Sequence, residues 1–163
     1  MNKNNLKIRS TTILGVRSKG KVAVAGDGQV TLGDMAMKQK AVKVRKFDSQ
    51  KGGVVGGFAG AAADALTLFE KFEQKLDEYE GDLKRSVVEM AKDWRTDKIL
   101  RHLEALLLVM DKGNSFIIAG DGNVIEPDGP IVAIGSGGGF AQAAATAFYQ
   151  SGKFSAKQIA EKS

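Results

Sequence analysis

The hydroxyl residues Ser10, Thr11 and Thr12 stand where a polar, basic head of ten residues meets the first predicted strand. If the head is removed before Thr11, that threonine supplies both a nucleophile and a base. Its free α-amine would have a pKa of about 7.7–8.0 and can accept the hydroxyl proton near neutral pH. The β-methyl group restricts χ1 and so aims the hydroxyl. Thr12 competes for the same role, and a threonine pair at a strand start is also ordinary; we prefer Thr11.

Other catalytic groups are scarce in this chain. It contains no cysteine, which excludes disulfides, thiol nucleophiles and cysteine-bound metals. The single histidine, His102, lies in a predicted helix near Arg101 and Glu104. We interpret it as a surface or packing residue, because a triad requires partners held in a defined geometry. An N-terminal threonine requires neither residue type, which suits this composition.

A glycine-rich segment at 135–139 lies between a predicted strand and a predicted helix, as phosphate-binding loops do. It lacks the Lys-Ser/Thr pair of a P-loop, and Phe140 stands where a dinucleotide-binding motif needs its third glycine. Asp77 and Glu78 are adjacent carboxylates on a helix surface, where solvation explains them. Nucleotide binding is therefore disfavoured.

The 163 residues, 43% of them hydrophobic and 26% charged, fit one globular domain. The net charge is +5, but Lys3, Lys7 and Arg9 lie in the head, and the rest of the chain has 21 basic and 19 acidic residues. This distribution argues against a nucleic-acid-binding module. No apolar run approaches the ~18–20 residues of a membrane span, and the head lacks the apolar core of a secretion signal. We expect a soluble, cytoplasmic protein.

Alternating apolar residues predict the strands. Two Asp-Gly pairs, at 27–28 and 121–122, signal hairpin turns because glycine tolerates positive φ. The predicted strands span residues 11–18, 20–26, 29–32, 41–47, 52–60, 105–111, 115–120 and 131–135.

A longer period predicts helices. Leu66, Phe69, Phe72 and Leu76 recur at intervals of three or four, which predicts an amphipathic helix over 61–80 that ends at Gly81. A second helix runs from an Asp82 cap to about residue 103. Its apolar residues are Val87, Val88, Ala91 and Trp94.

Two further helices close the chain. An alanine-rich segment predicts one over about 140–150, and Ser155 with Gln158 has the spacing of a capping box that opens the last. A helix of about nine residues is too short to be stable alone, and it stops at Ser163. We therefore expect the domain to be truncated at its C-terminus.

The order of elements predicts an α+β fold: strands, two helices, strands, two helices. A weak internal echo, AGDGQV at 25–30 and AGDGNV at 119–124, suggests two similar sheets. Facing sheets covered by helix pairs would form a four-layer αββα sandwich. We expect a single domain over 11–163, preceded by a prosegment, 1–10, that is removed on maturation.

Several segments, in one order along the chain, carry a resemblance to a known family. They are TTILGVRSKGKVAVAGDGQVTLG, KVRK, GGFAG, ADALTLFEKFE, VEMAKDWRTDKILRHLEALLLV and VAIGSGGGFAQAAA. Together they resemble the HslV (ClpQ) family of bacterial proteasome-like peptidases, from Thr11 to about Ser163. The resemblance implies an N-terminal-nucleophile hydrolase of the proteasome β-subunit type. It also implies a threonine protease processed at the Ser10–Thr11 bond.

The resemblance also implies roles for five residues. Thr11 would be the nucleophile, Lys43 the lysine against its hydroxyl, and Asp27 the acid that pairs with the lysine. Ser136 would place its hydroxyl near the α-amine, and the backbone N–H of Gly57 would donate to the oxyanion. A cation near the Thr11 hydroxyl stabilises the negative charge that develops during the reaction, which is the chemical reason for a lysine at this position.

Some features depart from the family pattern or stay loosely assigned. Lys38 falls in a family-like position and would line the pocket. The loop at 48–53 looks longer than usual. Relatives continue past the AEK segment with residues that bind a structural sodium ion, so that site would lie beyond Ser163 and no metal-binding residue is assigned here. We expect no cofactor in this chain. The resemblance implies that ATP is used only by a separate ATPase that partners the peptidase.

The resemblance implies the peptidase subunit of an ATP-dependent protease that hydrolyses unfolded proteins through an acyl-enzyme. Such subunits form two stacked hexameric rings capped by a hexameric ATPase, HslU (ClpY). The alternative is a non-catalytic ring or interaction subunit of the same fold, inactive because the C-terminal segment is missing or the head is unprocessed. No nucleic-acid or membrane partner is expected.

Overall fold

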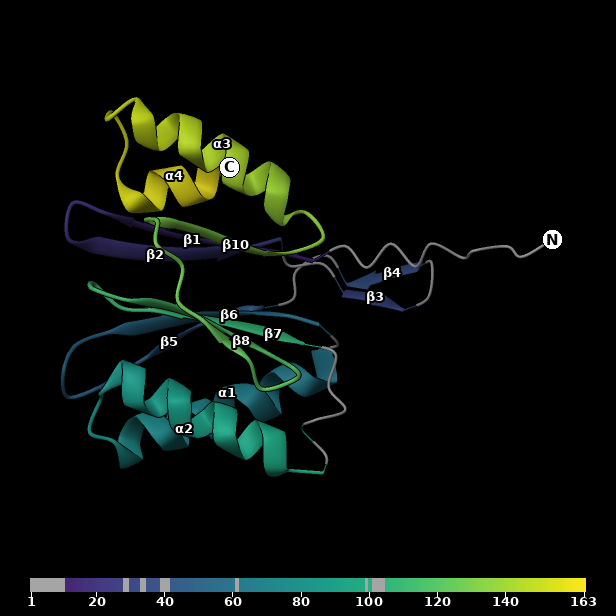
Figure 1. The fold of residues 1–163 in the computed structure, drawn as a ribbon. Coiled ribbons are helices and arrows are strands. Elements are labelled where there is room, and N and C mark those ends of the chain that lie inside the picture. Colours follow the sequence, from purple (N-terminus) through teal and green to yellow (C-terminus); the bar gives the residue numbers. More distant parts are fainter. Residues whose placement is uncertain are drawn as a thin grey trace.

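The computed structural model describes residues 11–27, 30–32, 35–38, 42–60, 62–98, 100 and 105–163. These residues form four layers, in which two facing sheets lie between two helix pairs (Figure 1). Helices α3 (Gly138–Gln150) and α4 (Ala156–Lys162) cover the first sheet. Helices α1 (Ala62–Glu78) and α2 (Leu83–Thr96) cover the second. The predicted α+β sandwich is confirmed.

The first sheet has β1 (Thr12–Ser18) at its centre, between β10 (Ile131–Gly135) and β2 (Lys21–Gly26), all antiparallel. The β1–β2 turn consists of Lys19 and Gly20, with φ of 52° and 71°. Positive φ at both central residues gives the turn a twist that matches the flanking strands. This short hairpin returns the chain from β1 to β2, so that the end of β2 lies beside the beginning of β1.

The second sheet is an antiparallel meander. Its strands, in order, are β5 (Val44–Phe47), β6 (Val54–Ala59), β7 (Leu106–Met110), β8 (Ser115–Ala119) and β9 (Val124–Ile125). Gly122, with φ of 79°, forms the predicted turn after β8. The other predicted hairpin turn includes Gly28, which lies outside the described residues.

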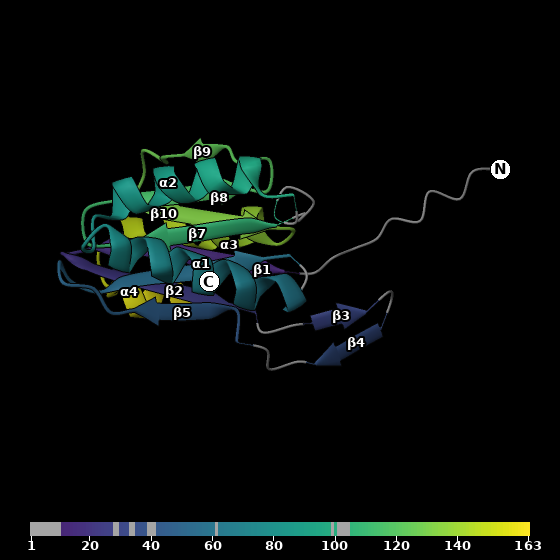
Figure 2. The same ribbon diagram turned by 90° about the horizontal axis from the view of Figure 1, so that it is seen from below.

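A separate two-stranded sheet pairs β3 (Val30–Leu32) with β4 (Met35–Lys38). Figures 1 and 2 show it beside the layered body rather than within it. The sequence patterns predict a strand at 29–32 and none at the position of β4. Four residues give too short an alternation to distinguish a strand from a loop.

The two sheets pack through an apolar layer in which Ile13 is fully buried. Glycine permits their close approach at Gly57 of β6, because a Cβ there would overlap Cγ2 of Ile13. The remaining buried members of this layer are Ala59, Leu108, Met110, Val132 and Ile134. A side chain at Gly57 would therefore separate the sheets at the end of the sandwich where β1 begins.

The helices follow the predicted faces with two corrections. Phe69, Phe72 and Leu76 of α1 are buried, but Leu66 is 61% exposed. In α2, Val87 is buried while Val88 is 40% exposed. Leu66 and Val88 were both predicted to be buried, and both lie next to the buried face of their helix. At such a position an apolar side chain can be either buried or exposed.

The helix ends are largely as predicted. Asp82 caps α2 by accepting from the Arg85 N–H at 3.0 Å, and Ser155 and Gln158 form a complete capping box on α4. Helix α2 ends at Thr96, earlier than predicted, and the residues that follow include 99 and 101–104, which are not described. His102 is among them.

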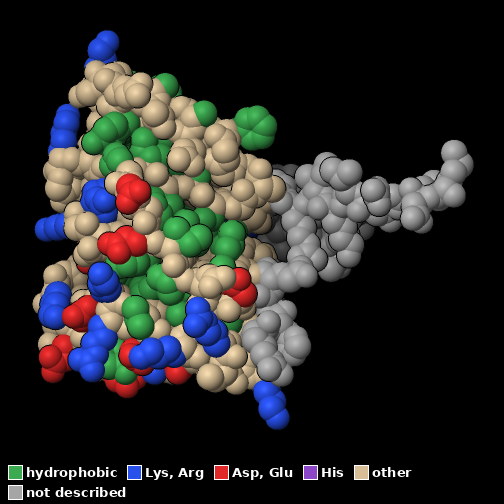
Figure 3. Space-filling model, viewed as in Figure 1, with side chains coloured by type: hydrophobic (Ala, Val, Ile, Leu, Met, Phe, Trp, Pro, Cys, Tyr) green, Lys and Arg blue, Asp and Glu red, His purple; other side chains and the backbone are tan. Residues whose placement is uncertain are grey.

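Charged side chains of both signs gather over the α1–α2 half of the face seen in Figure 3. Ion pairs link the two helices, including Lys75–Asp93 at 3.0 Å. This mixture is typical of a solvated helix surface. No helix within the described ranges is long and apolar enough to cross a bilayer.

Candidate active site

The predicted residues come together from four chain segments, each of which lies directly before or after a strand of one of the two sheets. Thr11 directly precedes β1, and Asp27 follows β2 in the same sheet. Ser136 follows β10, and Lys43 directly precedes β5 of the facing sheet. Because β2 and β10 both pair with β1, the segments after them converge on the start of β1.

Lys43 contacts the hydroxyl of Thr11. Its Nζ donates to Thr11 Oγ1 at 3.2 Å and to Asp27 Oδ1 at 2.9 Å. Lys43 is only 7% exposed, although it lies between two valines in the sequence. A buried ammonium group held by a carboxylate supplies fixed positive charge beside the hydroxyl, where it favours a developing alkoxide.

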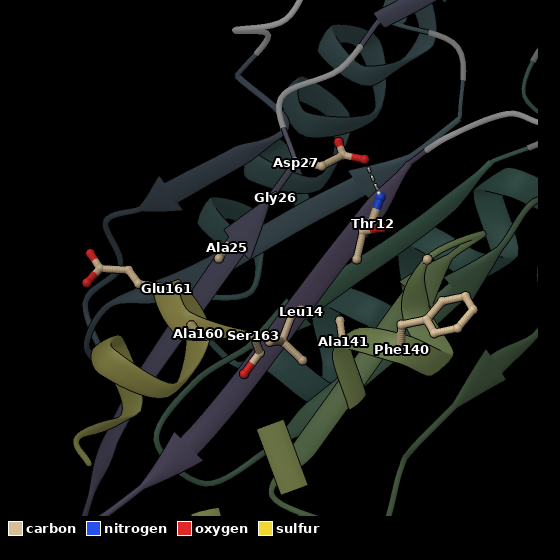
Figure 4. Close-up of a pocket in the computed structure, with 11 residues that line it drawn as sticks. Thr12, Leu14, Ala25, Gly26, Asp27, Phe140, Ala141, Ala160, Glu161 and Ser163 are labelled. Atoms are coloured by element: carbon tan, nitrogen blue, oxygen red, sulfur yellow. Dashed lines mark hydrogen bonds between the residues drawn. The ribbon is translucent and has the colours of Figure 1, made fainter. Parts of the chain in front are cut away.

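Asp27 holds the chain next to the nucleophile as well as the lysine. Its Oδ2 accepts from the Thr12 N–H at 2.9 Å, and its own N–H donates to the Thr12 carbonyl at 3.1 Å. The carboxylate thus connects the ammonium group of Lys43 to the backbone of Thr12. Figure 4 shows the hydrogen bond between Asp27 and the Thr12 N–H. Asp27 fixes the lysine and the Thr11–Thr12 segment relative to each other.

Ser136 contacts the nitrogen of Thr11. The Thr11 N–H donates to Ser136 Oγ at 3.2 Å. In the chain with its head attached, this nitrogen belongs to the peptide bond with Ser10. In a chain that begins at Thr11 it is the α-amine, so the serine lies within hydrogen-bond reach of the group expected to act as base.

Gly57 does not fit the predicted role of oxyanion donor. The neighbouring Phe58 N–H donates to the Lys43 carbonyl at 3.0 Å, toward β5. Successive residues of a strand direct their N–H groups to opposite sides, so Gly57 directs its own toward Leu108 of β7, its partner in the ladder. The N–H is used within the sheet, and the absence of a side chain serves the contact with Ile13 instead.

Two glycines that the sequence analysis did not assign also contact the threonine pair. A Cβ at Gly135 would overlap the Thr11 carbonyl oxygen, and a Cβ at Gly137 would overlap Thr12 Oγ1. The signal in the sequence is the glycine-rich segment 135–139, which indicates close approach but does not identify the neighbour. Lys38 lies in β4, but its side chain is outside the described residues.

A cavity of ≈ 560 Å³ opens beside this centre, on the helix side of the first sheet (Figure 4). Thr12 and Asp27 line it but Thr11 and Lys43 do not, so the cavity lies beside the threonine pair and does not include the Thr11 hydroxyl. No group of three or more His, Cys, Asp or Glu suited to a metal occurs among the described residues. The other cavity-lining residues are Leu14, Ala25, Gly26, Gly137, Phe140, Ala141, Ala160, Glu161 and Ser163.

Comparison with known proteins gives one consistent result. Residues 8–163 match the family model described as a proteasome subunit. The chain is 56% identical over 157 residues to the ATP-dependent protease subunit HslV of Treponema denticola, covering 96% of this chain and 87% of that protein. It is 54% identical over 158 residues to the protein of the same name in Aquifex aeolicus, covering 97% and 89%.

A solved structure agrees with these matches. The crystal structure of eukaryotic HslV from Trypanosoma brucei superposes with a TM-score of 0.83 at 48% identity, covering 93% of this chain and 86% of that one. Likeness in sequence and in fold therefore point to the same group of proteins.

Proposed function

The chain belongs to the proteasome family, and on that premise we propose that it is a threonine-type endopeptidase, the peptidase subunit of an ATP-dependent protease. The observation that carries the proposal is the contact of Lys43 Nζ with Thr11 Oγ1 at 3.2 Å, supported by Asp27 at 2.9 Å. Thr11 is the nucleophile of this site, in preference to Thr12, whose contacts involve Asp27 and Gly137.

The reaction begins when the α-amine of Thr11 takes the hydroxyl proton. The oxygen attacks the scissile carbonyl, and the tetrahedral intermediate collapses to an ester as the protonated amine gives its proton to the leaving peptide amine. Water, deprotonated by the same amine, then hydrolyses the ester. Lys43 stabilises the developing negative charge, while Asp27 holds Lys43 in place.

An N–H donor to the oxyanion completes the site. The edge of β6 that faces Lys43 carries the Phe58 N–H, which is bonded to the Lys43 carbonyl. The next N–H on the same edge belongs to Gly60, one residue past the end of β6. We assign the donor role to Gly60, in place of Gly57.

Maturation follows from the same chemistry. While residues 1–10 are attached, the Thr11 nitrogen is an amide and cannot act as a base. Cleavage of the Ser10–Thr11 bond would free it, and we propose on this ground that the head is a prosegment and the full chain a precursor.

The names of the relatives support a proposal about the partners of this chain. Two of them are named as subunits of an ATP-dependent protease. We propose two stacked hexameric rings of this chain, a hexameric HslU (ClpY) ATPase that delivers unfolded proteins, and a cytoplasmic location. ATP is used by the ATPase alone. A structural sodium ion is expected only from relatives, and no step depends on it.

The test uses the chain that begins at Thr11. We expect hydrolysis of a fluorogenic peptide, and a mass increase at Thr11 after reaction with a peptide vinyl sulfone. Thr11→Ala should abolish both, whereas Thr12→Ala should still be labelled. Undiminished hydrolysis by Thr11→Ala would contradict the assignment. In a parallel experiment with the full chain, retention of Met1 through assembly together with no labelling would favour the non-catalytic subunit.

A further inference from the structure

The turn between β10 and α3 lies directly against the Thr11–Thr12 segment. Gly135 has φ of 91°, and a Cβ on it would overlap the Thr11 carbonyl oxygen. A Cβ on Gly137 would overlap Thr12 Oγ1 and stand 3.3 Å from Thr12 Cβ. A side chain at either glycine therefore requires the threonine segment to move.

Conformation alone explains only one of these glycines. Gly135 occupies the left-handed region that favours glycine. Gly137 has φ of −90° and ψ of 2°, which other residues also adopt. What distinguishes position 137 is the contact with the Thr12 side chain. A Cβ on Gly139, two residues further on, would meet no atom within 4 Å, so Gly139 provides a matched control in the same run of glycines.

Asp27 holds the same segment through different atoms. It bonds the backbone N–H and carbonyl of Thr12, at 2.9 and 3.1 Å. The glycines contact the Thr11 carbonyl and the Thr12 side chain, and Ser136 between them accepts from the Thr11 nitrogen. Together these contacts leave the segment little freedom to shift its hydroxyl away from Lys43.

We propose that Gly135 and Gly137 are positioning residues, which set the Thr11 hydroxyl against Lys43 by confining the Thr11 carbonyl and the Thr12 side chain. This inference rests on the proposed function of Thr11. It assigns the glycines no contact with substrate; they act through the threonine pair. Loss of this confinement lowers the rate of acylation rather than substrate affinity, because a small displacement of reacting atoms is costly.

The experiment is a double-mutant cycle between Gly137→Ala and Thr12→Ala, in assembled chains that begin at Thr11. Removing the Thr12 hydroxyl and methyl removes the nearest obstacle to the new Cβ. In the parent background, Gly137→Ala should lower kcat and the rate of vinyl sulfone labelling by about 10- to 100-fold, with KM changed by less than about threefold. In the Thr12→Ala background the same substitution should change both by less than about threefold. Gly139→Ala should leave the parent values unchanged.

The remaining outcomes of the double-mutant cycle also test the positioning role of Gly137. Equal losses from Gly137→Ala in both backgrounds, or no loss in the parent, would overturn the inference. If Gly137→Ala fails to fold, a folded double variant supports the clash with Thr12, and an unfolded double variant overturns it. Thermal unfolding and particle size report folding. Undiminished labelling and hydrolysis by Thr11→Ala would instead overturn the proposed function, independently of the cycle.

Discussion

Lys43 and Asp27 form an ion pair across the two sheets, with 2.9 Å between Nζ and Oδ1. The lysine directly precedes β5 of one sheet, and the carboxylate follows β2 of the other. The Thr11 hydroxyl, which precedes β1, lies 3.2 Å from the same ammonium group. The distance between nucleophile and cation therefore depends on how the sheets pack, and the contact of Ile13 with Gly57 fixes that packing near the site.

Replacing Lys43 by methionine should remove the charge while keeping most of the buried volume. We expect kcat for peptide hydrolysis to fall by about 10²–10³-fold, as on loss of one group that stabilises an oxyanion. Activity within threefold of the parent would contradict the role of the lysine.

Replacing Asp27 by asparagine should destabilise the fold as well as the site. The amine of Lys43, which is only 7% exposed, would lose the carboxylate that pairs with it, which costs about 1–3 kcal/mol of unfolding free energy. Adding Lys43→Met should recover much of that loss, because no uncompensated buried cation remains. Denaturant unfolding of the two single variants and the double variant measures the coupling. Additive losses would show that the ion pair is not the cause.

Ser86 offers a control remote from the site. It is fully buried in α2, and its hydroxyl donates to the Asp82 carbonyl at 2.6 Å, with the Lys75 carbonyl of α1 at 3.2 Å. Ser86→Ala should lower the free energy of unfolding by about 1 kcal/mol. The kcat of the folded fraction should be unchanged. A loss of kcat would indicate that the α1–α2 pair influences the centre.

The link between α1 and α2 should weaken at alkaline pH. Hydrogen bonds to Asp93 and then to Glu78 raise the pKa of Lys75 above its usual 10.5. A raised pKa in the folded state stabilises the protein below the unfolded value and ceases to do so as pH rises through the folded value. The difference in unfolding free energy between the parent and Lys75→Met should be constant from pH 7 to 9 and shrink above about pH 10.5.

Lys84→Met is the matched control for that titration. Its ion pair with Glu126 is long, at 4.0 Å, and both side chains are more than half exposed. Such a pair contributes little to stability. Its difference from the parent should stay near zero over the same pH range, and a curve like that of Lys75→Met would point to general alkaline unfolding.

The sequence predicted the layers well because most strands and helices have a clear apolar period and marked turns or caps. The residues of the site were harder to predict from the sequence. Lys43 lies between two valines, so alternation alone suggests a solvent-facing side chain, yet Lys43 is buried and Val42 is 82% exposed. The ion pair with Asp27 reverses the usual preference there. Only the family resemblance identified Lys43 as a residue of the site.

Gly57 and the 135–137 segment show the opposite difficulty. Glycine in a sequence indicates close approach without naming the neighbour. At Gly57 the neighbour is Ile13, and hydrogen bonding within the sheet decides where its N–H points. At Gly135 and Gly137 the neighbours are residues more than 120 positions earlier in the chain, which no local pattern reveals.

The Thr11 hydroxyl is already aligned with Lys43 in a chain that still carries its first ten residues. If residues 1–10 are the prosegment that we propose, the delocalised lone pair of an acylated nitrogen, and not the placement of the hydroxyl, keeps the precursor inactive.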